Sequence, residues 1–188
     1  MTLIQAANAP TPQEIIYAQS ESRIEYVHGQ LVEKPVHLES TEIEGTIYSL
    51  LRTEAIKTRT VRVFTASLGY RCFPKEPKSF RKPDVSVVHS DRIAHLPPRT
   101  GLVPLPPDLA VDVLSPGDLA YDVGDKIQEY LGAGVGVIWI VEPNTRSVSI
   151  YRADGSITHL RQNDEITGET FFPSFKCNVA EFFVAGFD

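Results

Sequence analysis

The chain has 188 residues, 42% of them hydrophobic, and a formal net charge of −6, which fits one soluble globular domain better than two small ones. Its longest apolar run, VGVIWIV at 135–141, is too short to cross a bilayer. With only Cys72 and Cys177 and no signal-peptide pattern, we expect a cytoplasmic protein without a disulfide framework or a cysteine zinc site.

The N-terminal third predicts a short helix, a hairpin and a longer helix. TPQE at 11–14 combines a capping threonine, a first-turn proline and the glutamate of a capping box, so a helix begins near Thr11. In RIEYVHGQLVEKP, two β-prone runs flank His28-Gly29, which is typical of a hairpin turn. From about Thr41 to Lys57 apolar residues recur at helical spacing, which predicts the longer helix.

The middle of the chain predicts strands in a basic segment. TVRVFTASLGYRCF alternates as one half-buried strand, or as a pair bent near Gly69, and PDVSVV at 83–88 predicts the next strand. Between Lys57 and Arg99 there are ten basic and three acidic residues, a net +7 that leaves −13 for the rest. Such a segment could place a positive patch beside a polyanion. A solvated strand face with basic residues protecting a sheet edge explains the same charges.

The C-terminal half alternates strands and helices. A proline-rich connection at 89–107 leads to the strand DLAVDVLS, which PGD ends, and a helix follows from about Asp122 to Ala133. VIWIVEP predicts a buried strand. The two β-prone runs of SVSIYRADGSITHLR predict a hairpin that turns at Asp154-Gly155. Asn178 is expected to cap a last short helix. This order predicts a mixed α/β sheet with helices on its faces.

Two carboxylates stand in strands that are otherwise apolar. Asp84 shares a strand face with Ser86 and Val88, and Asp112 lies within LAVDVLS. If the two strands are neighbours, both carboxylates can emerge close together on one side. In a dry setting they would hold a proton between them or share a cation, for which Mg²⁺ or Mn²⁺ is the natural candidate.

The helix that follows places a lysine on its apolar stripe. Val123, Lys126, Ile127 and Tyr130 recur at helical spacing, whereas Asp125 and Glu129 fall on the solvent side. The stem of Lys126 can pack while its ammonium reaches water. Alternatively, Lys126 reaches the two carboxylates and helps to bind or activate an anionic group there. The spacing alone leaves both interpretations open.

As a set, RKPDVSVV, LAVDVLSPGD, YDVGDKIQEYLGAGVGVIWIVEP and the N-terminal RIEYVHGQLVEKP closely resemble the Uma-two family of restriction-endonuclease-like proteins, in the PD-(D/E)XK nuclease superfamily. The resemblance covers about Arg23 to Phe183. It implies an α/β (α+β) fold with a restriction-endonuclease-like core, that is, a central mixed β-sheet flanked by helices, with additional N-terminal and C-terminal β-hairpins. Residues 1–22 would be an N-terminal helical extension of a single domain at 23–188.

The resemblance also implies a site. Asp84 and Asp112 match the two metal-binding acids, with Mg²⁺ or Mn²⁺ as cofactor and the backbone carbonyl of Val113 as a further ligand. The family usually has Glu in place of Asp112, so the shorter side chain is a departure. Leu114 occupies the superfamily's usual lysine position, and Lys126 matches the lysine that has moved to the following helix. Glu44 could be another metal ligand, although Thr41-x-x-Glu44 is also a capping-box pattern.

From these matches we expect a metal-dependent endonuclease acting on nucleic acid, with DNA favoured and Asp84, Asp112 and Lys126 catalytic. Arg81, Lys82 and Tyr130 are the expected nucleic-acid contacts, and a homodimer is expected because symmetric cutting of duplex DNA favours it. Two alternatives stay open. One is a degenerate member that binds nucleic acid or protein without cutting. The other is a partner-binding domain whose acids are only paired with Lys126 in an internal salt bridge.

Overall fold

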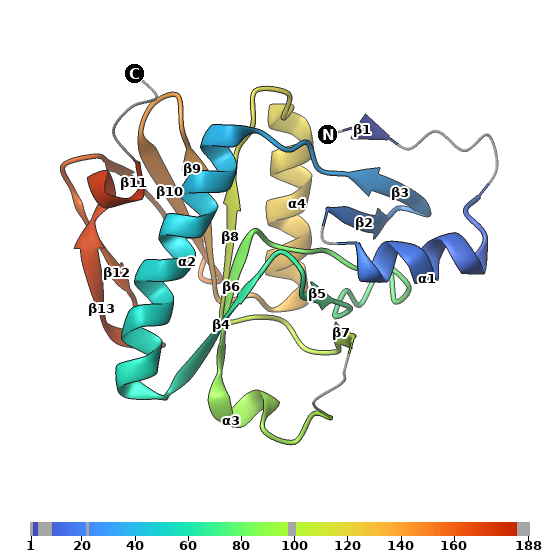
Figure 1. The fold of residues 1–188 in the computed structure, drawn as a ribbon, viewed down its shortest axis with the longest axis horizontal. Coiled ribbons are helices and arrows are strands. Elements are labelled where there is room, and N and C mark those ends of the chain that lie inside the picture. Colours follow the sequence, from blue (N-terminus) through green and yellow to red (C-terminus); the bar gives the residue numbers. More distant parts are fainter. Residues whose placement is uncertain (1, 4–8, 22, 98–100, 184–188) are drawn as a thin grey trace.

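A computed structural model describes residues 2–3, 9–21, 23–97 and 101–183 (Figure 1). At its centre is a six-stranded sheet of order β11-β10-β9-β8-β6-β4. Its strands are β4 (Val61–Thr65), β6 (Val85–His89), β8 (Leu109–Val113), β9 (Val137–Glu142), β10 (Ser147–Arg152) and β11 (Ile157–Arg161). Within this sheet, only β8 and β9 are parallel. A parallel pair needs a crossover, which α4 (Ala120–Ala133) supplies.

The two faces of this sheet are covered by different helices. Successive side chains of a strand point to opposite faces, so Val85, Val87, Leu109, Val111 and Trp139 pack with α2 (Leu38–Thr58). The alternate positions Ala110, Ile138 and Ile140 pack with Ile127 and Tyr130 of α4. The α2 face also receives a hairpin of β12 (Glu165–Gly168) and β13 (Phe172–Asn178), followed by the 3₁₀ helix η1 (Val179–Phe182). Burial of these apolar side chains drives the layered packing.

The N-terminal region forms a separate small sheet beside the central one (Figure 1). Helix α1 (Pro12–Ser20) is followed by β2 (Ile24–Val27) and β3 (Gln30–Glu33), and β1 (Thr2–Leu3) pairs with β3. The turn between β2 and β3 has positive φ at His28 (52°) and Gly29 (76°), as a two-residue hairpin turn requires. A backbone bridge between Tyr26 and Phe80 ties this sheet to the chain just before β6.

The predicted elements are largely confirmed, with four differences. Helix α2 begins at Leu38, so Thr41 lies inside it and the predicted capping box with Glu44 does not form. The hairpin at 147–161 is the edge of the central sheet and not an additional unit. The additional C-terminal hairpin that the resemblance implies is formed by β12 and β13, at residues for which the local pattern predicted no strands. The connection at 89–107 contains α3 (Ser90–Ile93) and β7 (Leu102–Val103), which pairs with β5 (Gly69–Tyr70), and Arg99 lies outside the described residues.

Cys72 and Cys177 are both free thiols. Over the described ranges, no helix has the length and apolar character needed to cross a membrane.

Candidate functional site

The register of the central sheet brings Asp84 and Asp112 together. In the antiparallel pair of β6 and β8, Val85 faces Val111 and Ser86 faces Ala110. Continuing this register by one residue sets Asp84 opposite Asp112, on the sheet face that α4 covers. Both side chains are buried, with exposed fractions of 2% and 4%. The predicted proximity of the two carboxylates is therefore present.

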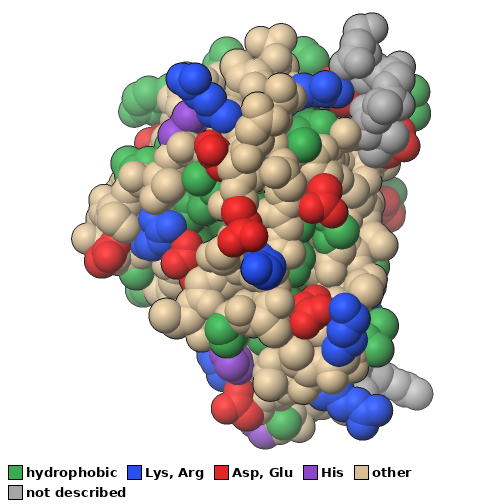
Figure 2. Space-filling view, turned by 90° about the vertical axis from the view of Figure 1, so that its left-hand side faces the viewer, with side chains coloured by type: hydrophobic (Ala, Val, Ile, Leu, Met, Phe, Trp, Pro, Cys, Tyr) green, Lys and Arg blue, Asp and Glu red, His purple; other side chains and the backbone are tan. Residues whose placement is uncertain are grey.

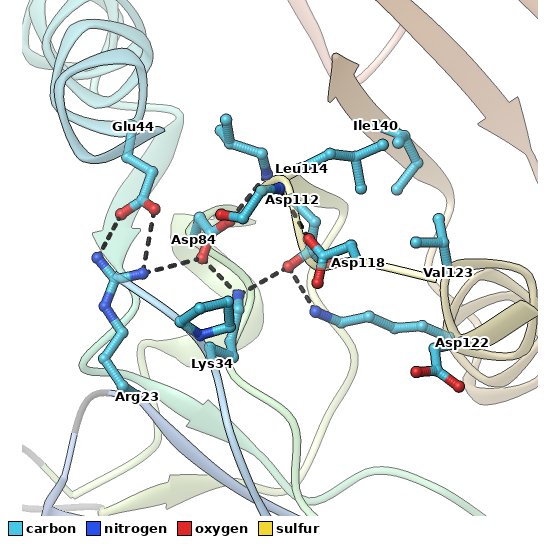
Figure 3. Close-up of a pocket in the computed structure, with 14 residues that line it drawn as sticks. Arg23, Lys34, Glu44, Asp84, Asp112, Leu114, Asp118, Asp122, Val123 and Ile140 are labelled. Atoms are coloured by element: carbon cyan, nitrogen blue, oxygen red, sulfur yellow. Dashed lines mark hydrogen bonds and ion pairs between the residues drawn. The ribbon is translucent and has the colours of Figure 1, made fainter. Parts of the chain in front are cut away.

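A lysine that is not among the predicted site residues lies between these carboxylates (Figure 3). Lys34 follows β3, and its ammonium donates to Oδ1 of Asp84 and, at 3.0 Å, to Oδ1 of Asp112. It also donates to the backbone carbonyl of Lys82 at 3.3 Å. The N-terminal sheet thus places the ammonium of Lys34 beside Asp84 and Asp112 of the central sheet region.

On the α4 side, Lys126 reaches the same centre. Its ammonium donates to Oδ1 of Asp112 at 2.6 Å and lies 3.7 Å from Oε1 of the fully buried Glu25. Its side chain is 10% exposed. Of the two interpretations of Lys126, the geometry therefore favours the one in which it meets a carboxylate over the one in which it extends to water.

Asp84, Asp112 and Lys126 line a cavity. On its α2 side, Glu44 also lines this cavity and is held by an arginine. Arg23 donates two parallel hydrogen bonds to the carboxylate of Glu44, at 3.1 and 2.9 Å, and its Nη1 lies 3.7 Å from Oδ1 of Asp84. Such a bidentate pair fixes both side chains. The structure brings Glu44 to the site, with its oxygens turned toward Arg23 (Figure 3).

The charges at this centre determine which groups ionise. Burial would raise the pKa of Asp112, but Lys126 and Lys34 outweigh it and hold the pKa well below its ordinary value. Burial would lower the pKa of Lys34, but Asp112 and Asp84 keep it well above its usual range. Burial raises the pKa of Asp84 against the opposing effect of Lys34, and it raises that of Glu44 as well. Asp112 and Lys34 are therefore the firmly charged pair.

The donor set fits a cation held by two carboxylates. Oδ2 of Asp112 is buried and has no hydrogen-bond partner, so one acid oxygen is left for a ligand. Oδ2 of Asp84 accepts from the backbone N–H of Val113 at 2.8 Å, which fixes that carboxylate. Within the described ranges, no group of three or more His, Cys, Asp or Glu side chains could hold a metal ion. A hard ion here would therefore need main-chain or solvent oxygens as well.

The residues expected to contact nucleic acid lie inside the protein. Arg81 is 3% exposed and pairs with Glu25 at 2.9 Å and with Glu129 at 2.6 Å. Lys82 is fully buried and donates to backbone carbonyls of Ala18, Gln19 and Glu21. Tyr130 is also fully buried, under the ammonium of Lys126. In this arrangement none of the three presents its side chain to a polyanion, because each is packed or paired internally.

Glu129 differs from its predicted place. It was expected on the solvent side of the helix with Asp125, which is exposed. Its side chain is only 23% exposed, because Arg81 and His28 both contact it.

Three exposed basic residues of the predicted basic segment lie far from the cavity. Lys57, Arg59 and Arg62 are exposed at the C-terminal end of α2 and on β4. Arg59 follows Glu44 by fifteen positions, a rise of about 22 Å at 1.5 Å per residue, and Figure 1 shows α2 running between the two ends of the molecule. On the face drawn in Figure 2, acidic and basic side chains are interspersed and no continuous basic patch is visible.

Three site residues that sequence reasoning missed come from the N-terminal hairpin: Arg23, Glu25 and Lys34. Strand alternation carried a signal for two of them. Glu25 shares the inward face with Val27, and Lys34 follows the buried Val32 by two residues. A charged residue on an apolar strand face is uncommon unless it is paired.

A family model described as "Uma2: Putative restriction endonuclease" matches residues 12–180. A crystal structure of a putative nuclease belonging to DUF820 from Anabaena variabilis is similar, with a TM-score of 0.77 and 21% identity, over 93% of this chain and 97% of that chain. At that identity the similarity shows the fold. Among curated proteins, none matches.

Proposed function

The chain belongs to the Uma2 restriction endonuclease family, and from that membership we propose that it is an endonuclease that needs Mg²⁺ or Mn²⁺ to hydrolyse phosphodiester bonds of DNA. The observation that supports this most directly is the pair of buried carboxylates, Asp84 and Asp112, gathered around one cationic group at the wall of a cavity. A cytoplasmic homodimer completes the proposal, since symmetric cutting of a duplex favours two copies.

Asp84, Asp112 and the backbone carbonyl of Val113 would hold the ion. When bound, it would supply Lewis-acid chemistry, by lowering the pKa of a water molecule and offsetting charge on the phosphate. The protein pre-positions its oxygens for this. The N–H of Val113 fixes Asp84, while Lys126 fixes Asp112 through Oδ1 and leaves Oδ2 without a partner.

Lys126 is the proposed stabiliser of negative charge on the phosphate. Its side chain is buried, and in such a setting a fixed charge acts more strongly on developing charge than it does in water. Glu25 lies behind it and keeps the position of the ammonium, so that reaction requires little rearrangement at this residue. Lys126 would also orient the attacking water.

A second candidate function has its own supporting observation. Because Lys34 already bridges both acids, the same geometry suits a member of the family that binds nucleic acid without cutting it. Asp112, at a position where the family usually has Glu, also favours the candidate that does not cut. The test below separates the two candidates.

The first prediction concerns plasmid nicking. Wild type should nick supercoiled DNA with Mg²⁺ or Mn²⁺ and not with EDTA, and Asp84→Asn, Asp112→Asn and Lys126→Met should each lower the rate about 100-fold or more. The measurement is the rate of relaxed-circle formation on agarose gels, with circular dichroism to confirm folding. Asp125→Asn is the matched control, because Asp125 is exposed on the same helix. Equal cutting by all variants would identify a contaminating activity, and a gel-mobility shift of the plasmid without cutting would support the second candidate.

A further inference from the structure

The ammonium of Lys34 occupies the position between the two acids. It contacts Oδ1 of Asp84, Oδ1 of Asp112 and the carbonyl oxygen of Lys82, and the side chain is 12% exposed. Three oxygens around one point, two of them carboxylate, are also what a hard divalent ion seeks. Lys34 and such an ion would therefore use the same acid oxygens.

Repulsion prevents the ammonium of Lys34 and a divalent ion from using these acid oxygens together. The carboxylates of Glu44, Asp84 and Asp112 are matched in contact by Arg23, Lys34 and Lys126. A divalent ion bound to Asp84 and Asp112 would lie against the ammonium of Lys34, and like charges in contact in a buried place are strongly unfavourable. One of the three cationic side chains must then give way.

Lys34 is the side chain best placed to leave. Arg23 is held by two hydrogen bonds to Glu44. Lys126 has Glu25 as a second carboxylate neighbour and is fixed on the buried face of α4. Lys34 instead lies beyond the end of β3, just before Pro35, and its carboxylate partners are Asp84 and Asp112. Its flexible four-carbon stem can turn outward without moving the backbone.

We propose that Lys34 is an internal cation that competes with the divalent ion for Asp84 and Asp112, and that its displaced ammonium then becomes the cation that receives a DNA phosphate. This rests on the proposed function. It also supplies a cation for the phosphate. The three cationic side chains that line the cavity, Arg23, Lys34 and Lys126, are all paired with carboxylates. Displacement of Lys34 makes one of them available only when the ion has bound.

The test compares Mn²⁺ binding to wild type and Lys34→Met by titration calorimetry without DNA. Methionine keeps the length and the apolar stem but removes the charge. We expect Lys34→Met to bind Mn²⁺ about 10-fold more tightly or better, the usual scale of coupling between competing groups. At saturating Mn²⁺ the same variant should cut DNA more slowly than wild type, because the phosphate has lost its cation. Lys78→Met, at an exposed loop position, is the control and should match wild type in both assays.

A second measurement uses the wild-type protein and does not depend on the variant folding. Reductive methylation followed by peptide mass spectrometry should modify Lys34 slowly in EDTA and faster at saturating Mn²⁺, with Lys126 protected in both. Equal Mn²⁺ affinity of wild type and Lys34→Met, or unchanged methylation of Lys34, would overturn the displacement. If metal-dependent cutting persists in that case, the endonuclease proposal stands. Absence of Mn²⁺ binding by both proteins, together with absence of cutting, would overturn both proposals.

Discussion

At the scale of single residues, Glu25 shows how a side chain that need not touch a substrate can determine the site. It is fully buried and accepts from Arg81 at 2.9 Å and from the backbone N–H of Lys82 at 2.8 Å. Burial would raise its pKa, but Lys126, Arg81 and Lys34 outweigh it and keep the pKa below its ordinary value. A charged Glu25 therefore holds two buried cations in place behind Asp112.

Glu25→Gln should lower the free energy of unfolding by about 3 kcal/mol at pH 7, because breaking a buried ion pair leaves a charge uncompensated. Urea denaturation checks this, with Glu33→Gln on the neighbouring strand as the exposed control. Since the folded pKa of Glu25 is lowered, its contribution is present above the ordinary value near 4.5 and is lost as pH falls through the folded value. The difference between wild type and variant should therefore shrink below about pH 4. A difference independent of pH would show that the amide loses packing rather than charge.

At the scale of secondary-structure elements, local sequence patterns predicted the features that depend on neighbouring residues alone, namely turns and the buried face of a helix. His28-Gly29 predicted the hairpin, because both positions need positive φ, and the stripe on α4 placed Lys126 inward. Thr41 and Glu44 show the limit of such patterns. Their spacing matches a capping box, yet the helix continues three residues further toward the N-terminus and Glu44 is held by the distant Arg23. Nothing within a window of a few residues encodes a partner twenty-one positions away.

The contribution of Lys34 could not be predicted for the same reason. Its role requires knowing that the N-terminal hairpin docks beside Phe80, and that contact depends on tertiary packing of two separate sheets. The alternation of Val32 and Lys34 shows that the lysine faces inward but not what it meets. Asp84 and Asp112 were more predictable, because two apolar strands that each carry one acid leave few arrangements in which both are compensated.

Helix α4 gives a prediction at this scale, because its two relevant glycines differ in backbone conformation. Gly124 lies within the helix, and a Cβ added there would have no neighbouring atom within 4 Å. Gly124→Ala should therefore raise the free energy of unfolding by about 1 kcal/mol, because alanine has the higher helix propensity. Gly134 has φ +92° at the C-terminal cap, so Gly134→Ala should lower it by about 1 to 2 kcal/mol. Thermal and urea unfolding of the two variants measure both values. Destabilisation by Gly124→Ala would contradict the open environment of that position.

At the scale of the whole molecule, the charge distribution determines how DNA can approach. The net charge is −6, and the cavity is lined by five carboxylates, those of Glu44, Asp84, Asp112, Asp118 and Asp122, against three cationic side chains. The exposed cations Lys57, Arg59 and Arg62 lie toward the other end of α2. A polyanion therefore meets a repulsive field at the cavity until a divalent ion cancels the net negative charge of its lining.

Binding of DNA should consequently depend on a divalent ion even when no bond is cut. By fluorescence anisotropy with a labelled duplex, we expect affinity at least about 10-fold higher with Ca²⁺ than with EDTA, since one bound divalent ion neutralises the net −2 of the cavity lining. The variant Lys57→Gln/Arg59→Gln/Arg62→Gln tests the other end of the molecule and should retain this Ca²⁺ dependence. Tight binding in EDTA that the triple variant abolishes would show instead that the basic end holds the duplex. In that case the acidic cavity would have to act on DNA that is anchored elsewhere on the protein.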